Sequence, residues 1–294
     1  MLLKNLLVEW ESYYYPHLTA KTAHNYDMIV HKRLIPAIGD WSVPDITKKM
    51  AQGYVDGALQ IYAASTVKDS LKVLKSAVKY YIDAYDKLYV DQFQRLIFPK
   101  DRQKVKTFAQ QEAEAIISSF RVHWMHDVAL MAYMTGMRCG EILALQFDDI
   151  DFDQNCLLVH QALSGYDDIV YIKETKTGNE RIVYFGSRVR QMLLRRRKKA
   201  PGPFVFSRPD GQLINPRCVR DNMSSACKRL GIKQKGRGIH AIRHTHATLA
   251  LDAGANIKVV SERLGHSSVS ITLDTYYHPE YSQQTSIVDM FDPA

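Results

Sequence analysis

Four short segments in the second half of the chain carry side chains that together could bind and attack a phosphate ester. They are residues 135–141 with Arg138 and Glu141, the stretch around Lys176, residues 240–244 with His240 and Arg243, and residues 264–266 with His266, followed by Tyr276. On a helix beginning near Gly238, His240 and Arg243 would share one face because they are three residues apart. Such a pair suits a tetrahedral phosphate, since a guanidinium donates two parallel hydrogen bonds and an imidazole donates a third.

Each of these residues also has a common structural explanation when it is taken alone. Arg138 could be a surface arginine at a helix start, His266 a cap or turn residue, and Tyr276 a half-buried core residue. His240, His244 and His246 could suggest a metal site. We disfavour that interpretation because no Glu or Cys falls at the customary zinc spacing, and the intervening Arg243 would repel a metal ion.

The elements that must position these residues are mostly helical. We expect helices over 109–120 and 125–135, strands over 156–163, 169–174 and 181–185, and helices again after Ser187. The last two strands are predicted to form a hairpin through residues 175–180, in which Gly178 supplies the positive φ. No alternation of strands and helices indicates a Rossmann fold. The predicted fold class is mainly α with a small antiparallel β-sheet, that is, α+β.

The first half of the chain is predicted to be a helical bundle. Helices are expected over 3–14, 20–33, 45–62 and from Ser65 onward; Thr19 is a possible N-cap, and Pro36 and Gly39 should end the second helix. In the fourth helix, apolar residues recur at three- and four-residue steps from Val67 to Tyr85, which predicts one buried face. Its lysines, among them Lys68, Lys72 and Lys75, fall on the opposite side, as on any solvated helix face or on one that contacts an anion.

Length and composition indicate two folded domains. A chain of 294 residues exceeds the size at which a single core usually stops growing. Residues 99–107 contain four cations and one acid without apolar periodicity, as in an exposed linker. The predicted division is therefore a helical domain over 1–98, a basic linker over 99–107, and a second domain over 108–294.

The net charge of +8 favours a polyanionic partner, and the cations are concentrated in a few stretches. Residues 188–199 hold seven cations and no acid, and residues 217–237 hold seven cations and one acid. We predict that the following residues contact the backbone of a polyanionic partner such as a nucleic acid: Lys68, Lys72, Lys75, Lys104, Lys106, Arg195, Arg217, Arg220 and Arg237.

Cysteine usage and apolar runs indicate a cytoplasmic protein. The four cysteines, Cys139, Cys156, Cys218 and Cys227, form no Cys-x-x-Cys pair and are expected to be buried small hydrophobes. No run approaches the roughly 18 apolar residues of a membrane span, and the chain start is not a signal peptide.

The order and spacing of the four segments resemble the tyrosine recombinase (phage integrase) family. That family shows Arg in Thr-Gly-x-Arg-x-x-Glu, Lys in a β-hairpin, His-x-x-Arg, Leu-Gly-His, and a Tyr about ten residues later in a Tyr-x-His context. Residues 1–98 are similar to its helical core-binding domain, including 22–26 and 34–39. The resemblance implies a core-binding bundle followed by a catalytic domain in a site-specific recombinase or integrase that cleaves and rejoins DNA.

The resemblance also implies a role for each residue. Arg138, Arg243 and His240 would hold the phosphate oxygens, His266 would hydrogen-bond the scissile phosphate, and Lys176 would protonate the departing 5′ oxygen. Tyr276 would become joined to the 3′ phosphate, with Glu141 in a supporting role, and His240 is also a candidate for taking the tyrosine proton. Neither a metal, ATP nor any other cofactor would be needed.

Two assignments have alternatives. His278 selects Tyr276 as the nucleophile over its neighbour Tyr277, because the family places the nucleophile two residues before a His. The strand end beside the turn favours Lys176 over Lys173.

The implied partners are double-stranded DNA and three further copies of the chain, in a homotetramer on two synapsed sites; DNA-bending or directionality proteins are candidate partners. The apolar tail residues Ile287, Val288, Met290 and Phe291 could dock on a neighbouring protomer or on their own domain.

Two alternative functions are a type IB topoisomerase and a non-catalytic DNA-binding accessory factor. Phage integration, transposition and dimer resolution stay open, as do the DNA site and whether an N-terminal arm-binding domain belongs before Met1. The expected location is the cytoplasm, where a bacterial or phage-encoded protein of this kind would be associated with DNA.

Overall fold

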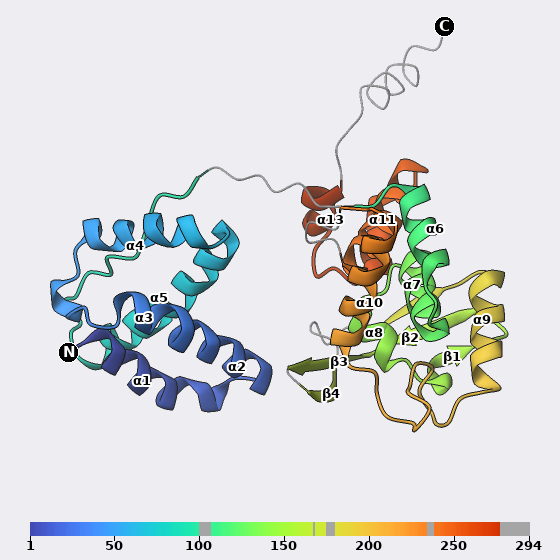
Figure 1. Ribbon diagram of the computed structural model, residues 1–294, viewed down its shortest axis with the longest axis horizontal. Coiled ribbons are helices and arrows are strands. Elements are labelled where there is room, and N and C mark those ends of the chain that lie inside the picture. Colours follow the sequence, from blue (N-terminus) through green and yellow to red (C-terminus); the bar gives the residue numbers. More distant parts are fainter. Residues whose placement is uncertain (100–106, 167, 175–179, 234–237, 277–294) are drawn as a thin grey trace, which may run out of the picture. The chain divides into compact units, whose positions relative to one another are not determined.

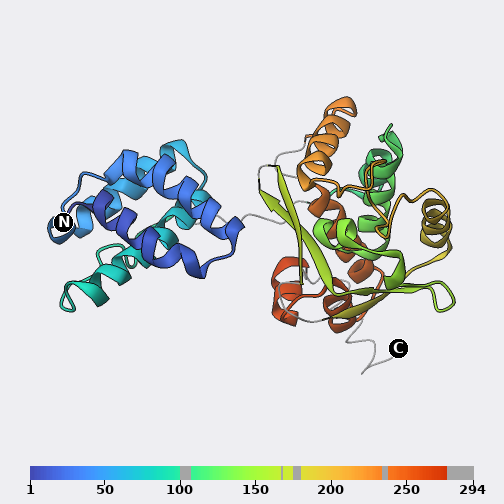
Figure 2. The same ribbon diagram turned by 90° about the horizontal axis from the view of Figure 1, so that it is seen from below.

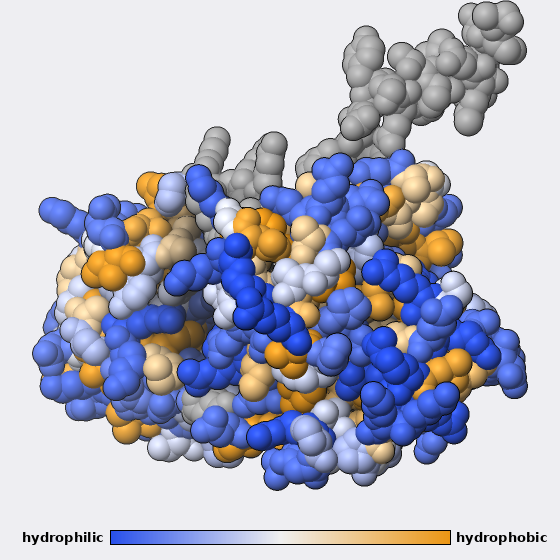
Figure 3. All heavy atoms as spheres, turned by 45° about the vertical axis from the view of Figure 1, so that its right-hand side comes forward, coloured by the Kyte–Doolittle hydropathy of each residue, from blue (hydrophilic) through white to orange (hydrophobic). Residues whose placement is uncertain are grey.

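The computed structural model divides the chain into two compact units, residues 1–103 and 104–294 (Figure 1). It describes all residues except 100–106, 167, 175–179, 234–237 and 277–294. The predicted linker lies almost wholly outside the described residues, so its role stays a prediction. Among the helices of the described residues, none is long and apolar enough to cross a membrane. On the face shown in Figure 3, hydrophobic residues are scattered among hydrophilic ones.

The first unit is a helical bundle. Its helices are α1 (Leu3–Tyr14), α2 (Ala20–Ile29), α3 (Ile35–Ile38), α4 (Lys48–Ile61) and α5 (Ala64–Ala84). The core includes the fully buried Trp10, Val30 and Leu74. The predicted buried face of α5 is confirmed at Val67, Leu71, Leu74 and Val78, but its expected last residue, Tyr85, follows the helix and is exposed.

The second predicted helix begins as expected but does not end as expected. The Thr19 hydroxyl caps α2 by accepting a hydrogen bond from the Thr22 amide. The chain then passes through a π-helical turn, Val30–Leu34, into α3. Pro36 lies in the first turn of α3, where its missing N–H breaks no hydrogen bond, so the prediction that it ends the helix was wrong. Gly39 does end α3.

The second unit combines helices with two small sheets (Figures 1 and 2). Its helices are α6 (Gln110–Ser119), α7 (His123–Thr135), α8 (Cys139–Ala144), α9 (Ser187–Arg197), α10 (Pro216–Arg229), α11 (Ile239–Asp252), α12 (Ile257–Leu264) and α13 (Val269–Tyr276). Its strands are β1 (Ile150–Asp151), β2 (Cys156–Val159), β3 (Gln161–Tyr166), β4 (Ile169–Glu174) and β5 (Arg181–Tyr184). The mainly α class with antiparallel sheets is confirmed.

The strand pairing differs from the prediction. One sheet has the order β1-β2-β5 and the other is the pair β3-β4, all antiparallel. The predicted strand 156–163 is therefore two strands, and the predicted hairpin between 169–174 and 181–185 was wrong. Tyr166 pairs with Ile169, so β3 and β4 are joined by a two-residue connection, which is the shortest hairpin loop. The predicted turn with Gly178 lies outside the described residues.

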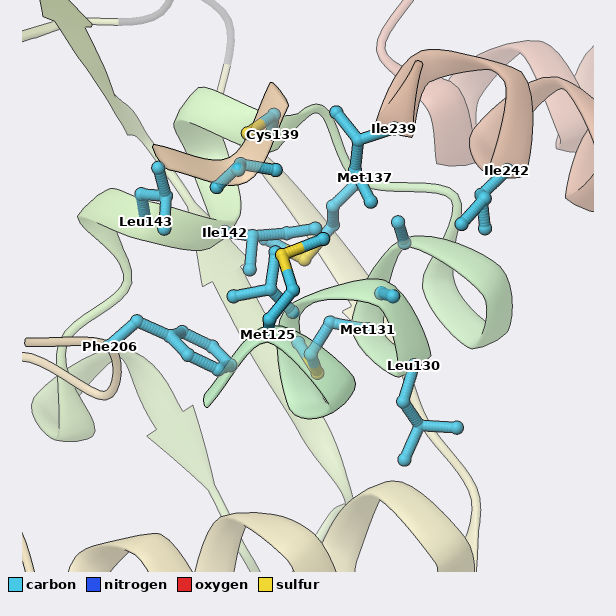
Figure 4. Packing of buried hydrophobic residues seen from close by; sticks show 14 of the residues in the cluster. Met125, Leu130, Met131, Met137, Cys139, Ile142, Leu143, Phe206, Ile239 and Ile242 are labelled. Atoms are coloured by element: carbon cyan, nitrogen blue, oxygen red, sulfur yellow. The ribbon is translucent and has the colours of Figure 1, made fainter. Parts of the chain in front are cut away.

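The main apolar core of the second unit surrounds α7, and a separate smaller cluster packs α11, α12 and α13 against one another. Met125, Val128, Leu130 and Met131 are buried on different sides of this helix, as expected for one enclosed by protein. Figure 4 shows Met125 and Met131 of α7 beside Ile142 of α8, and Ile239 and Ile242 project from α11 toward the same core.

The cysteines do not all match the prediction. Cys139, Cys156 and Cys227 are buried, and burial raises the pKa of the Cys139 thiol to about 12. Cys218 is exposed on α10, so its predicted burial was wrong. It precedes the buried Val219 on an amphipathic helix, and one residue rotates the side chain by about 100° around the axis.

Candidate active site

The predicted catalytic residues within the described chain lie around one pocket of the second unit. Arg138 directly precedes α8, His240 and Arg243 lie on α11, and His266 follows α12; all four line a pocket of about 560 Å³. Tyr276 is the last residue of α13, and its ring lies parallel to the ring of His266 with 6.3 Å between centroids. Segments far apart in the chain thus meet at one place.

The C-terminal end of α12 binds three arginines through consecutive backbone carbonyl groups. The hydrogen bonds run from Arg181 Nε to Arg263 O over 2.9 Å, from Arg243 Nη2 to Leu264 O over 2.8 Å, and from Arg138 Nη2 to Gly265 O over 2.8 Å. The last carbonyl groups of a helix have no partner within the helix, and they form the negative end of its dipole. The helix end therefore both satisfies its own acceptors and holds three positive charges together.

Glycines in the left-handed conformation follow α12 and α7, and the carbonyl groups of both glycines bind arginines. Gly265 follows α12 with φ 67°, and Gly136 follows α7 with φ 70°. The Gly136 carbonyl accepts from Arg243 Nη1 over 2.7 Å. A Cβ at position 265 would lie 2.7 Å from Arg181 Nη1, and one at position 136 would lie 2.6 Å from the His246 ring. Both positions therefore require glycine, for backbone conformation and for space.

Glu141 joins two of the three arginines. Its carboxylate accepts from Arg138 Nη1 over 2.8 Å and from Arg181 Nη2 over 2.6 Å, and it also caps α8 through the Arg138 amide. Burial alone would raise the pKa of Glu141, but the hydrogen bond and charge of Arg181, and then Arg138, lower it. Glu141 is therefore a buried carboxylate that orients two guanidinium groups.

Arg181 is a site residue that the sequence analysis missed. It lies on β5 with its side chain 11% exposed, and its carboxylate partner is 40 residues away in the chain. One signal was available. In a strand, alternate residues share a face, so Arg181 lies on the same face as the fully buried Val183. An arginine that faces a core requires an acidic partner.

Arg243 is the most buried of the pocket cations, with 4% of its surface exposed. Burial, followed by the charge of Arg138, lowers its pKa to about 9, so the guanidinium stays protonated at neutral pH. Two of its five N–H groups are used by backbone carbonyls, which leaves others for an anion in the pocket. The site therefore contains fixed cations before any substrate binds.

The pocket histidines are held neutral. His266 Nδ1 lies 2.8 Å from the hydroxyl of the buried Thr272, and burial together with the charges of Arg243 and Arg138 lowers the His266 pKa to about 4. His240 is exposed at the pocket, and its pKa is lowered by partial desolvation and then by Arg243 and Arg138. Neutral imidazoles can each donate one hydrogen bond to a phosphate without adding charge.

His244 contacts the Tyr276 hydroxyl and is the second residue that the sequence analysis missed in this role. Its Nδ1 is hydrogen-bonded to Tyr276 Oη, and the two ring centroids lie 5.4 Å apart. Burial raises the pKa of Tyr276, although Arg243 and Arg138 oppose this effect. The available signal was helical spacing, because His244 lies four residues after His240 on one helix face.

Two of the three histidines of α11 have different hydrogen-bond partners. His246 Nδ1 bonds the Tyr133 carbonyl over 2.8 Å, whereas His244 bonds Tyr276. Within the described residues, the one cluster of His, Cys or acidic groups close enough to share a metal ion is Glu11, Asp27 and His31 in the first unit, and its groups are half-buried or exposed.

Of the two candidate lysines, Lys173 on β4 lines the pocket. Lys176 lies outside the described residues, so its assignment as the general acid stays a prediction. The same holds for Tyr277 and His278.

The predicted DNA-contacting cations do not share one environment. Lys68 and Lys72 are exposed on α5 and Lys75 is half-buried there, while Arg217 and Arg220 are exposed on α10 near Asp221. Lys104, Lys106 and Arg237 lie outside the described residues.

Arg195 differs from the other surface cations because it is paired with a buried acid. Its Nη2 donates to Asp127 over 2.6 Å, and Asp127, 1% exposed, also accepts from Arg196 over 3.0 Å. A separate pocket of about 430 Å³ adjoins this group and contains none of the predicted catalytic residues. The contact of Arg195 with DNA stays a prediction.

Comparison with known sequences places the chain in a family. The sequence pattern of the phage integrase family matches residues 106–283, which is more than half of the chain. The pattern of the phage integrase N-terminal SAM-like domain matches residues 2–59. The chain belongs to the phage integrase family.

Individual relatives share about a quarter to a third of their residues with the chain. A tyrosine recombinase XerC-like protein of Caldanaerobacter subterraneus is 30% identical over 63% of this chain and 54% of its own length. The tyrosine recombinase XerC of Bacillus licheniformis is 26% identical over 86% of this chain and 82% of its own length. The chain thus spans about half the length of the first relative and most of the second.

Solved structures with the same fold include two integrases bound to DNA. The Tn1549 transposon integrase with a circular intermediate DNA superposes with a TM-score of 0.87 at 19% identity, covering 99% of both chains. A lambda integrase dimer on a COC′ core site gives 0.76 at 18% identity, covering 96% of this chain and 100% of the other. The fold of the whole chain is therefore that of these proteins.

Proposed function

We propose that this chain is a site-specific DNA recombinase that cleaves and rejoins DNA through a 3′-phosphotyrosyl intermediate. The observation that carries this proposal is the convergence of Arg138, Arg243, His240 and His266 on one pocket, with the Tyr276 hydroxyl beside it. Phosphate esters need cations and donors at the oxygens that gain charge, and a phenol needs activation before it attacks. The pocket offers both.

The arginines would stabilise the pentacoordinate transition state. Arg138 and Arg243 are already oriented by carbonyl oxygens, so little reorganisation is needed when the phosphate charge increases. Each preorganised donor of this kind contributes about 2.7–4 kcal/mol to catalysis. The cleaved phosphodiester is conserved as the phosphotyrosine ester, so a freed 5′ hydroxyl of another strand can reverse the reaction without ATP. Two permanent cations perform the charge neutralisation for which other phosphoryl-transfer enzymes use a metal.

The departing 5′ oxygen needs a proton, and a lysine would supply it. We propose Lys176 in this role, with Lys173 as the alternative because it lines the pocket. A DNA substrate with a 5′-bridging sulfur distinguishes them, since a thiolate leaves without protonation. Lys176→Ala should cleave normal DNA slowly and should recover its cleavage rate on the sulfur substrate. Lys173→Ala should cleave both substrates at similar rates.

We propose double-stranded DNA as the substrate and a homotetramer on two synapsed sites as the active assembly. The relatives that support this are integrases solved as a dimer on a core site and as a tetramer on a Holliday junction. Residues 1–98 would be the core-binding domain, 99–107 the linker and 108–294 the catalytic domain. The exposed cations of α5 and α10 would contact the DNA backbone. DNA-bending or directionality proteins are further candidate partners.

The proposal can be tested on DNA chosen by the protein itself. Duplexes bound by the full chain are selected from a random library, and a nick near the selected site then traps a cleaved strand. We expect a covalent protein–DNA band that retains a label at the 5′ end of the cleaved strand, because the tyrosine would hold the 3′ phosphate. Tyr276→Phe should abolish the band, while Tyr184→Phe, an exposed tyrosine of β5, should not.

Retained DNA binding without any band would contradict the proposal and favour a non-catalytic accessory factor. Relaxation of supercoiled plasmid without transfer to a second duplex would favour topoisomerase chemistry instead.

A further inference from the structure

Two histidine rings lie beside Tyr276, and one of them is hydrogen-bonded to its hydroxyl. His244 Nδ1, from α11, is hydrogen-bonded to Tyr276 Oη, from α13. The ring of His266, from the turn between α12 and α13, lies parallel to the ring of Tyr276 with an interplanar angle of 1°. His266 therefore lies parallel to the phenol ring, whereas His244 contacts the reactive atom.

The direction of this hydrogen bond follows from the charges around it. His244 faces Arg243 and His240 on its own helix, Tyr276 on α13 and His266 before α13. Burial and then the charge of Arg243 lower its pKa to about 4, so the ring is neutral at pH 7. With Tyr276 protonated, Oη–H donates and Nδ1 accepts, which leaves the imidazole proton on Nε2.

His240 is less suited to accept this proton. It is exposed at the pocket, and within the described residues no hydrogen bond joins it to Tyr276. Its position beside Arg243 in the pocket lining suits a donor to the phosphate oxygens instead.

We infer that His244 is the general base that takes the proton of Tyr276 during DNA cleavage. The inference rests on the proposed phosphotyrosyl chemistry. As the bond between Tyr276 Oη and phosphorus forms, the phenolic proton moves to His244 Nδ1. The bond between phosphorus and O5′ breaks, and O5′ receives a separate proton from the lysine acid. In rejoining, His244 returns its proton to the departing tyrosine oxygen.

The arrangement also couples the base to the substrate. Without DNA, the positive charge of Arg243 beside His244 disfavours an imidazolium ion, so Tyr276 stays protonated. A phosphodiester bound to Arg138 and Arg243 places a negative charge next to the same ring and favours its protonation. Tyr276 is thus activated when a phosphate occupies the pocket.

The test measures single-turnover formation of the covalent band at saturating nicked DNA. His244→Ala should lower this rate by about 10²–10⁴-fold, the usual contribution of a general base. Free imidazole should restore part of the rate by entering the space left by the ring. Among substituted imidazoles of similar size, the restored rate should rise with their pKa.

Two variants separate proton transfer from positioning. His244→Asn places an amide oxygen near the Nδ1 position, so it keeps an acceptor but no base, and it should stay slow. His123→Asn removes an exposed histidine outside the pocket and should leave the rate unchanged. Restoration by imidazole in the same sample shows that His244→Ala is folded.

Each other result overturns the inference. A wild-type rate in His244→Ala shows that no base acts at this position. Three results would show that His244 only positions the tyrosine. They are a wild-type rate in His244→Asn, no rescue of His244→Ala by imidazole, and a rescue that does not depend on the pKa of the imidazole. A rescue with pKa dependence in His240→Ala alone assigns the proton to His240. If the wild-type chain forms no covalent band at all, the proposed function fails, and the inference fails with it.

Discussion

Two groups of cations in this chain differ in how they are held. Arg138, Arg181 and Arg243 are bound by the carbonyl groups that end α12, and Glu141 joins two of them. Lys72 on α5 and the cations of α10 are exposed at helix surfaces. We expect the first group to resist replacement because geometry as well as charge is set, and the second group to supply charge alone. Net charge therefore says little about which cations are catalytic.

The strongest test of the first group removes the acid that it surrounds. Glu141→Ala leaves Arg138 and Arg181 without their carboxylate, and breaking a buried pair typically costs about 3–5 kcal/mol of unfolding free energy. Hydrogen exchange of the α7 and α8 amides should report this loss. Glu114→Ala, which changes an exposed acid of α6, should stay within about 0.5 kcal/mol. Equal protection in both variants would show that the carboxylate does not stabilise the cluster.

A like-charged substitution tests geometry against charge. We expect Arg243→Lys to slow covalent cleavage by about 10²–10³-fold at saturating DNA, because lysine cannot reach two carbonyls and a phosphate at once. Arg263→Lys is the matched control, since Arg263 also donates to carbonyls, of Met134 and Tyr184, but does not line the pocket. A cleavage rate in Arg243→Lys equal to that of the control would mean that charge alone suffices.

Three half-buried histidines, two that line the pocket and one on α11 outside it, make stability depend on pH. His244, His246 and His266 have pKa values of about 4 in the fold, against about 6.5 in an unfolded chain. The unfolded state therefore binds more protons below pH 6.5, and stability should fall as the pH drops from about 6.5 through 4. Calorimetry from pH 7 to 4 measures this, and His246→Asn should flatten the dependence. A melting temperature constant over this range would contradict the shifts.

The exposed cations should give the smallest effects. Lys72→Ala and Arg217→Ala should each weaken DNA binding and lower the salt slope by about one, without slowing cleavage at saturating DNA. Arg195→Ala sharpens the comparison. The Arg195 guanidinium is already bound to Asp127, so its removal should change the salt slope of DNA binding less. Binding titrations at several salt concentrations measure all three. A slower saturated cleavage rate in Lys72→Ala would place that lysine in the first group.

The sequence predicted the helices and the family motifs better than it predicted contacts. The apolar periodicity of α5 and the spacing of His240 and Arg243 are local, so they could be read directly. The roles of Arg181 and His244 depend on Glu141 and Tyr276, which lie 40 and 32 residues away. The pairing of β4 with β3 was missed because Asp167-Asp168 lacks the Gly or Asn that usually marks a two-residue turn.

The most direct test of the phosphotyrosyl mechanism locates the covalent bond itself. The protein is trapped on nicked DNA of the selected sequence, digested with nuclease and protease, and analysed by mass spectrometry for a peptide carrying a nucleotide. We expect the modification on Tyr276, linked to a 3′ phosphate, and its loss in Tyr276→Phe. A nucleotide on Tyr277, on another residue or on a 5′ phosphate would contradict the mechanism.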